Sequence, residues 1–230
     1  HGNMMGIKDF YNYCKKKNAK LKEEGKPEFI PILGWEMYVA HHNKEDKVRD
    51  HGDQSGYHLI VLAKNAQGYH NLIKLVSRAW VDGFYMRPRT DRKDLEKYHE
   101  GLIVCSACIA GEVPAKILKG NIEGAREAVE WYHNLFGDDY YLELQRHEVK
   151  DPNIRANRET FPLQQKANRV LIEFAKEYGI KLICSNDSHF VDQENAEAHD
   201  RLLCLSTGKD LDDSNRMLYS KQEWFKTREE

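Results

Sequence analysis

The chain has 230 residues, and its 35 lysine and arginine residues are nearly balanced by 37 aspartate and glutamate residues, for a formal net charge of −2. This balance excludes a strongly cationic nucleic-acid arm and an acidic tail, so any nucleic acid would be held by local basic patches or by metal. The longest apolar run, about residues 59–63, is far too short to span a membrane. The five scattered cysteines form no disulfide framework, and we expect a reduced, cytoplasmic protein.

Helical and extended patterns alternate along the first half of the chain. Apolar spacing predicts helices over residues 6–24 and 67–80. Extended segments are predicted at 29–33, 36–40 and 57–63, and the last of these is a nearly continuous apolar run that favours a strand buried on both faces. The polar stretch 41–56 is predicted to be a surface loop, and residues 83–90 a loop broken by Pro88.

The alternation continues in the second half. Strands are predicted at 101–106, 140–145 and 180–185, and helices at 112–136 (broken near Gly120), 161–178 and 195–205, followed by a loop-like tail from residue 206. Gly179 is a good stop signal for the long helix before it. Repeated strand–helix units favour an α/β domain with a parallel sheet, either open or closed into a barrel.

Side chains that can bind metal recur beside the ends of the predicted strands. In α/β folds the loops beyond the carboxyl ends of the strands converge on one face, where sites are built. Imidazole, carboxylate and thiolate groups are the ligands of zinc, manganese and iron, so this placement indicates a metal site. The residues concerned are Glu36, His58, Cys105, Cys108, His147, Asp187 and His189.

Simpler interpretations of single residues remain open. In isolation, His58 is better explained as a core histidine with a satisfied hydrogen bond. We interpret Cys105 as a buried small hydrophobic residue, and Cys108, beyond the strand end, as the candidate ligand. Arg87 and Arg89 could bind phosphate oxygens, but a solvated loop explains them about as well.

Seven motifs taken together resemble a known family. In chain order they are His1-Gly2-Asn3-Met4, Gly34-Trp35-Glu36-Met37-Tyr38-Val39, Tyr57-His58-Leu59-Ile60-Val61-Leu62-Ala63, Gly83-Phe84-Tyr85, Ser106-Ala107-Cys108-Ile109-Ala110-Gly111-Glu112, Asn186-Asp187-Ser188-His189 and Ala198-His199-Asp200. They resemble the PHP (polymerase and histidinol phosphatase) domain of bacterial DNA polymerase III alpha subunits. The resemblance places a PHP domain at residues 1–216 and the start of a connection toward a polymerase core at 217–230.

The resemblance implies a distorted seven-stranded β/α barrel with a cluster of divalent metal ions. Carried over by motif, the expected metal ligands are His1, Glu36, His58, Cys108, Asp187 and His189. His147 is a possible neighbour of the site rather than a motif ligand. The family's opening His-x-His segment and its first two strands are expected before His1, so the barrel is expected to be incomplete in this chain.

What the resemblance implies about function is twofold. The parent is expected to be a DNA-directed DNA polymerase whose magnesium-binding carboxylates lie outside this chain. The PHP domain itself, with zinc, manganese or iron, is expected to act as a phosphoesterase or 3′–5′ exonuclease. The expected partners are DNA, the polymerase core of the same polypeptide, a proofreading exonuclease subunit and other replisome subunits, with no membrane.

Two alternatives differ in class. A catalytically inert module that docks the proofreading subunit would need no metal chemistry. A stand-alone PHP phosphoesterase such as a histidinol phosphatase is disfavoured by the polymerase-type motifs at residues 83–85 and 198–200.

Overall fold

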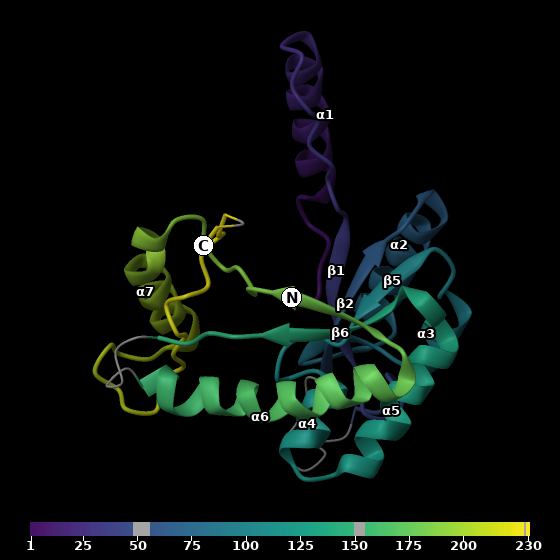
Figure 1. Cartoon of the computed structure of the whole chain (residues 1–230), viewed down its shortest axis with the longest axis vertical. Coiled ribbons are helices and arrows are strands. Elements are labelled where there is room, and N and C mark those ends of the chain that lie inside the picture. The colour runs from purple at the N-terminus through teal and green to yellow at the C-terminus, as the bar shows by residue number, and fades with distance from the viewer. Residues whose placement is uncertain (48–55, 150–154, 228) are drawn as a thin grey trace.

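The computed structural model describes residues 1–47, 56–149, 155–227 and 229–230. Part of the surface loop predicted over 41–56, and part of the polar stretch after residue 145, lie outside these residues. The described chain is a mixed α/β fold in which helices pack against a single sheet (Figure 1).

Seven strands form the sheet in the order β3-β4-β1-β2-β5-β6-β7. Their bounds are β1 Gly34–Val39, β2 Tyr57–Ala63, β3 Phe84–Tyr85, β4 Arg87–Thr90, β5 Leu102–Cys105, β6 Tyr140–Gln145 and β7 Lys181–Ser185. The pairs β1–β4, β5–β6 and β6–β7 are parallel, whereas β2 runs antiparallel to both of its neighbours, β1 and β5. The expected parallel sheet is therefore a mixed sheet in the structure.

The reversal of β2 has a physical reason that the sequence already contains. No helix is predicted between β1 and β2, and antiparallel neighbours need no helical crossover, whereas parallel neighbours do. Along β2 only Leu59 and Val61 are fully buried, and the strand's other residues are partly exposed. The interpretation of this strand as buried on both faces is therefore also wrong.

Residues 83–90 are not the simple loop that Pro88 suggested. β3 and β4 form a short antiparallel hairpin, with Phe84 opposite Pro88 and Met86 in the left-handed region at φ 61°. Beyond Pro88, Arg89 and Thr90 pair with β1. Proline is tolerated here because the strand is short and Pro88 faces only the two-residue end strand.

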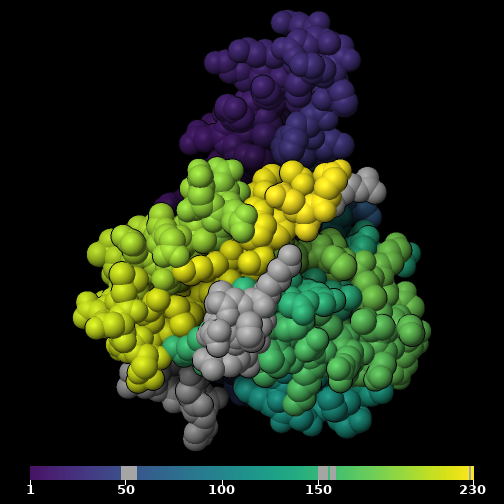
Figure 2. Space-filling view, turned by 60° about the vertical axis from the view of Figure 1, so that its left-hand side comes forward, coloured from purple at the N-terminus to yellow at the C-terminus, as the bar shows by residue number. Residues whose placement is uncertain are grey.

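The helices are α1 Ile7–Glu23, α2 Ala66–Val81, α3 Arg92–Lys97, α4 Glu112–Leu118, α5 Ile122–Phe136, α6 Arg155–Tyr178 and α7 Ala196–Thr207. Helices α2, α4, α5 and α6 contact the strands or one another and cover the core. Helix α1 instead projects from the rest of the molecule, alongside the segment that returns to β1 (Figures 1 and 2). Asn18 of α1 holds that segment through two hydrogen bonds to the backbone of Phe29.

The hydrophobic core lies between the sheet and helices α2, α4, α5 and α6. Its largest fully buried side chains include Tyr132, Tyr140, Phe174 and Met37. The last strand, β7, is different, because Leu182 and Ile183 keep 41% and 38% of their surface exposed. The core is therefore densest at the centre of the sheet, around β1, β2, β5 and β6.

Two glycines at equivalent helix positions test how the core constrains the backbone. Gly68 and Gly124 each donate a backbone hydrogen bond to the asparagine that caps their helix. A Cβ at Gly68 would lie 1.8 Å from the carbonyl oxygen of Gly101, whereas one at Gly124 would meet only the side chain of Asn121.

We expect Gly68→Ala to destabilise the fold by about 3 kcal/mol, because backbone atoms cannot move aside. Gly124→Ala should destabilise the fold by no more than about 1 kcal/mol, because only the capping side chain of Asn121 has to shift and alanine's better helix propensity offsets part of the weakened cap. Urea unfolding of the two variants measures the difference. Equal destabilisation would show that the approach of Gly101 does not constrain α2.

Candidate metal centre

Three side chains from separate segments meet at one end of the strands in the middle of the sheet. Glu36 lies on β1, and its Oε1 is 2.7 Å from Nε2 of His1 and 3.4 Å from Nδ1 of His58. The register places His58 opposite Tyr38, two residues beyond Glu36. Potential ligand atoms of His1, Glu36 and His58 all lie within 4.8 Å of one another, so the group could hold a metal ion.

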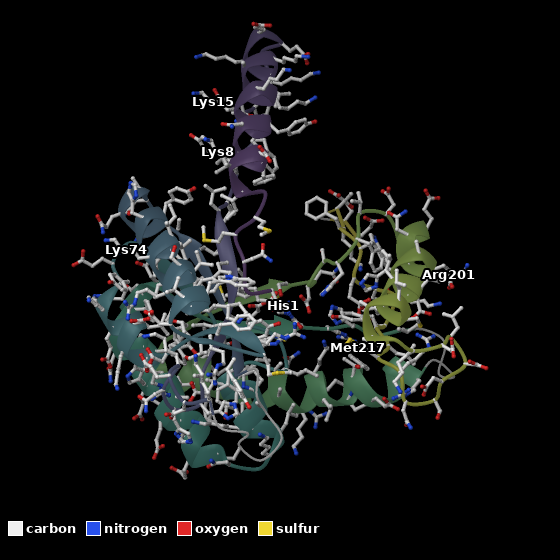
Figure 3. All side chains as sticks on the ribbon, turned by 180° about the vertical axis from the view of Figure 1, so that it is seen from behind. His1, Lys8, Lys15, Lys74, Arg201 and Met217 are labelled. Carbon is white, nitrogen blue, oxygen red and sulfur yellow. The ribbon has the colours of Figure 1, made fainter. Side chains whose placement is uncertain are left out.

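The position of His1 follows from the residue after it. The backbone N–H of Gly2 donates to the carbonyl of Glu36 at 2.8 Å, and the indole of Trp80 donates to the carbonyl of Gly2 at 2.9 Å. Gly2 has φ +76°, and a Cβ there would lie 2.8 Å from Pro88. Only glycine adopts this conformation without strain so close to a neighbour, so Gly2 directs His1 toward Glu36. Figure 3 shows His1 in the middle of the molecule.

The electrostatics of the group favour charge on Glu36. Burial alone would raise the pKa of Glu36, but hydrogen bonds from His1 and His58 outweigh it and lower the pKa to about 2. The hydrogen bond to Glu36 in turn raises the pKa of His1. Glu36 is therefore an anionic group at neutral pH that is already surrounded by two imidazoles, an arrangement suited to a divalent cation.

Cys108 approaches the same group from the loop after β5. Its Sγ lies 3.5 Å from Nδ1 of His58, and the loop is tied to β2 by the hydrogen bond from the N–H of His58 to the carbonyl of Ala110. Burial raises the pKa of the Cys108 thiol to about 12. Burial by itself therefore favours the protonated thiol, and a bound cation would reverse that preference.

Asp187 and His189 enter from the loop after β7. Asp187 adopts φ 50°, and Nδ1 of His189 lies 2.6 Å from the carbonyl oxygen of Asp187. The rings of His189 and His1 are 6.5 Å apart between centroids. Burial raises the pKa of Asp187, and the charge of Glu36 raises it further. The six residues expected to be metal ligands therefore lie near one another in the structure.

One detail of the prediction, that the candidate ligands lie beyond the carboxyl ends of the strands, does not hold for every residue. Glu36 lies within β1, and His58 lies at the beginning of β2 rather than after a carboxyl end. Because β2 is antiparallel to β1 and β5, its first residues lie beside the carboxyl ends of those two strands. The candidate centre therefore forms at one end of the strands, although its residues do not all follow strand carboxyl ends.

A family model described as "PHP domain" matches residues 1–147, which is more than half of the chain. The chain belongs to the PHP domain family. The motif resemblance is thereby confirmed, and the cluster of histidine, carboxylate and thiol groups lies largely within the matched span.

Similar proteins with curated names extend the match over the whole chain. The DNA polymerase III subunit alpha of Borreliella burgdorferi is 42% identical over 231 residues, covering 100% of this chain and 18% of that protein. The subunits of Thermus aquaticus and Deinococcus radiodurans are 37% and 36% identical, covering 100% and 98% of this chain. The chain spans less than a fifth of the length of these relatives.

His147 and the two arginines occupy different surroundings in this PHP fold. His147 is buried, with Nε2 2.9 Å from the carbonyl of Asn186 and Nδ1 2.9 Å from Nε2 of Gln164. Its contact with Asn186, the residue before Asp187, makes it a neighbour of the candidate centre.

Arg87 and Arg89 point to different places. The guanidinium of Arg87 lies 6.0 Å from the ring centroid of Tyr38, which stacks on His1. Arg89 is only 6% exposed and donates to the carbonyls of Gly83, Lys44 and Asp46. Its Nε and Nη2 groups are thus engaged by backbone carbonyls, whereas Arg87 stays close to the centre. Phosphate binding by either arginine stays a prediction.

Several groups near the centre escaped the sequence analysis. Glu143 of β6 is buried, and burial raises its pKa, with the charges of Asp187 and Glu36 adding to the effect. Tyr219 and Glu223 come from the tail predicted as a loop, and the Tyr219 hydroxyl lies 3.2 Å from Nε2 of His189. A carboxylate inside the Leu-Glu-Leu segment 142–144 was a signal that could have indicated Glu143. The tail offered no such signal.

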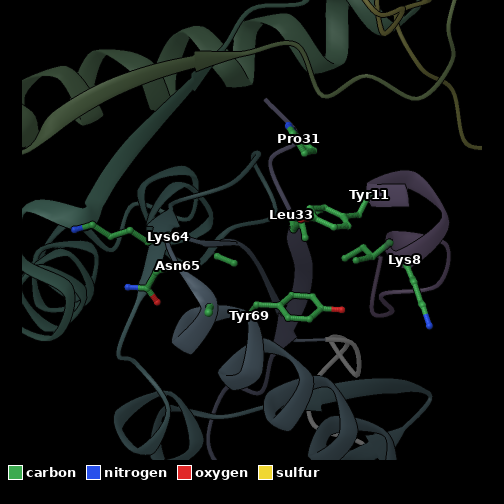
Figure 4. Close-up of a pocket in the computed structure, with 10 residues that line it drawn as sticks. Lys8, Tyr11, Pro31, Leu33, Lys64, Asn65 and Tyr69 are labelled. Atoms are coloured by element: carbon green, nitrogen blue, oxygen red, sulfur yellow. The ribbon is translucent and has the colours of Figure 1, made fainter. Parts of the chain in front are cut away.

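The fold also contains a cavity away from these residues. A space of about 490 Å³ at the base of α1 is lined mainly by apolar and aromatic groups, among them Tyr11, Leu33 and Tyr69, with Lys8 and Lys64 at its sides (Figure 4). No histidine, cysteine or carboxylate lines it, so it does not compete as a metal site among the described residues. The helices of the described chain include none with the length and apolarity to cross a membrane.

Proposed function

We propose that this PHP domain is part of a DNA polymerase III alpha subunit, and that its candidate centre binds divalent metal and hydrolyses phosphodiesters as a 3′–5′ exonuclease. The observation that carries the proposal is the group formed by His1, Glu36 and His58. Three further residues of ligand type, Cys108, Asp187 and His189, lie around it.

The donor set fits a transition metal. Glu36 is a partly buried carboxylate whose nearest partners are imidazole nitrogens, and nitrogen and carboxylate oxygen ligands suit zinc, manganese and iron. Cys108 adds a softer donor that favours zinc or iron. A divalent cation here would supply activation of water at neutral pH and stabilisation of the charge on a phosphate.

The protein's own residues would then orient the substrate. Arg87 lies beside the Tyr38 ring that stacks on His1, so its guanidinium could pair with a phosphate oxygen of DNA. His147 would position the loop that carries Asp187, through its bond to the carbonyl of Asn186. These roles require no charged group from outside the described residues.

The wider context follows from the relatives. We propose a PHP domain over residues 1–216, followed by the start of the connection to a polymerase core, whose DNA polymerisation would use magnesium. The described sheet would form part of the distorted β/α barrel of the family. DNA, that core, a proofreading exonuclease subunit and other replisome subunits would be its partners.

Metal titration combined with a nuclease assay tests the proposal. Mn²⁺ and Zn²⁺ are titrated calorimetrically into the chelator-treated chain, and 3′-end hydrolysis of a labelled single-stranded oligonucleotide is followed with and without metal. We expect binding of at least one cation and metal-dependent release of mononucleotides.

The assay also separates the alternatives. Metal binding without hydrolysis would favour the inert docking module. Hydrolysis of histidinol phosphate in place of DNA would favour a stand-alone phosphoesterase. Absence of metal binding would contradict the proposed centre.

A further inference from the structure

Tyr219 lies against the candidate centre although it comes from the tail after α7. Its ring centroid is 4.6 Å from that of His189 and 5.1 Å from that of His199. Its hydroxyl lies 3.2 Å from Nε2 of His189. No motif of the sequence analysis included this residue.

The protonation of His189 determines which atom donates in this contact. Nδ1 of His189 lies 2.6 Å from the carbonyl oxygen of Asp187, which can only accept, so Nδ1 carries the proton. Nε2 then carries a lone pair that can accept a hydrogen bond. The Tyr219 hydroxyl donates to that lone pair, which is the atom His189 would offer to a cation.

The tail holds Tyr219 from both sides. On one side, the guanidinium of Arg216 forms a bidentate ion pair with Asp200 of α7, in which Nη2 lies 2.9 Å from Oδ2. On the other side, the backbone N–H of Ser220 donates to Glu223 at 3.0 Å. The first pair fastens the tail to α7, and the second stabilises the turn that follows Tyr219.

The segment beyond Tyr219 is fastened to the loop that carries the candidate ligands. Nδ2 of Asn186 donates to the carbonyls of Gln222 and Trp224, at 3.0 and 2.7 Å. The N–H of His189 donates to the carbonyl of Glu223 at 2.8 Å. The tail and the loop 186–189 thus form one unit, so Tyr219 keeps its place relative to Asp187 and His189.

The phenolic hydroxyl of Tyr219 can donate one hydrogen bond and accept others. A cation that takes up the lone pair of His189 would displace this hydroxyl, which then needs another acceptor nearby because the tail backbone stays beside the centre. Because the hydroxyl carries no charge, it repels an anionic ligand less than a further carboxylate in the same position would.

We propose that Tyr219 is a phosphate-recognition residue of the centre, donating its hydroxyl proton to an oxygen of the phosphate group bound there. This inference rests on the proposed metal centre. It assigns to the tail a direct contact with the ligand.

The test compares Tyr219→Phe with the parent chain in two titrations. Mn²⁺ is titrated into each metal-free protein, and inorganic phosphate is then titrated into each Mn²⁺-loaded protein. We expect the Mn²⁺ dissociation constant to stay within about threefold, and the phosphate dissociation constant to rise about tenfold or more, as for loss of a hydrogen bond to a charged group.

Tyr13→Phe is the matched control, because Tyr13 is 69% exposed on the projecting helix α1. It should change neither titration. Phenylalanine keeps the ring contacts of Tyr219 with His189 and His199, so the melting temperature of the metal-free variant should match that of the parent within a few degrees.

The outcomes separate this inference from the proposed function. An unchanged phosphate dissociation constant in Tyr219→Phe, with both ligands bound by the parent, overturns the inference alone. Weaker Mn²⁺ binding with unchanged phosphate binding overturns it too, because Tyr219 would then only position His189. A parent chain that binds no Mn²⁺ overturns the metal centre and the inference together.

Discussion

Asp187→Asn is expected to reduce metal-dependent hydrolysis of single-stranded DNA by a factor on the order of 100 or more. The substitution removes an anionic oxygen from the loop beside His189 while keeping nearly the same shape. The melting temperature of the metal-free chain should change little, because the carboxylate is not part of the hydrophobic core. Initial rates with a labelled oligonucleotide in Mn²⁺, at a fixed enzyme concentration, measure the effect.

His70→Ala is the control for Asp187→Asn. His70 is exposed on α2 and lies outside the candidate centre, so its loss should leave the rate within about twofold of the parent. If Asp187→Asn is as active as the parent, the ligand role carried over from the family motif is wrong. If the parent itself has no metal-dependent activity, the inert docking module explains the domain better.

The sequence predicted the strands and helices better than it predicted their directions. The apolar runs at residues 57–63 and 140–145 correspond to strands β2 and β6 with the same bounds. The antiparallel course of β2 follows from the connection before it, in which no helix is predicted, and the apolar periodicity within a strand carries no information about that connection. Pairing of β4 with β1 likewise overrode the local signal of Pro88.

The residues of the candidate centre also differ in whether the sequence could predict them. Residues within motifs, such as Glu36 and His58, could be chosen in advance because their types and order match a family. Glu143, Tyr219 and Glu223 could not, because they reach the centre through tertiary packing of β6 and of the tail. A tyrosine in a polar tail has no local pattern that distinguishes it from a solvated residue. Its role depends on its own bond to His189 and on the bond from Asn186 to Gln222, and each bond joins residues at least 30 positions apart in the chain.

Glu36→Gln should have the largest effect on metal affinity. Glu36 is the acidic member of the three-residue group, and its Oε1 faces both His1 and His58. Glutamine keeps the size of the side chain but loses the negative charge, and its amide nitrogen is a donor that cannot bind a cation. We expect the Mn²⁺ dissociation constant to rise by a factor on the order of 100 or more in calorimetric titration.

Glu127→Gln supplies the matched control for Glu36→Gln, because Glu127 is exposed on α5 and the same charge is lost there. Its Mn²⁺ affinity should equal that of the parent. An equal loss in both variants would mean that overall charge, rather than the group around Glu36, attracts the cation.

The metal-free chain gives an independent readout of the same carboxylate through its pH dependence. The pKa of Glu36 is lowered from 4.5 to about 2 in the folded state, so its ionised form stabilises the fold above about pH 4.5. That contribution is lost as the pH falls from about 4.5 toward 2, because the carboxylate is then protonated in both states. In chelator at pH 6, Glu36→Gln should therefore unfold at lower urea concentration than the parent, and the difference should shrink below pH 4. A difference that persists unchanged at low pH would show that packing, rather than the ion pair with His1 and His58, is what glutamine disturbs.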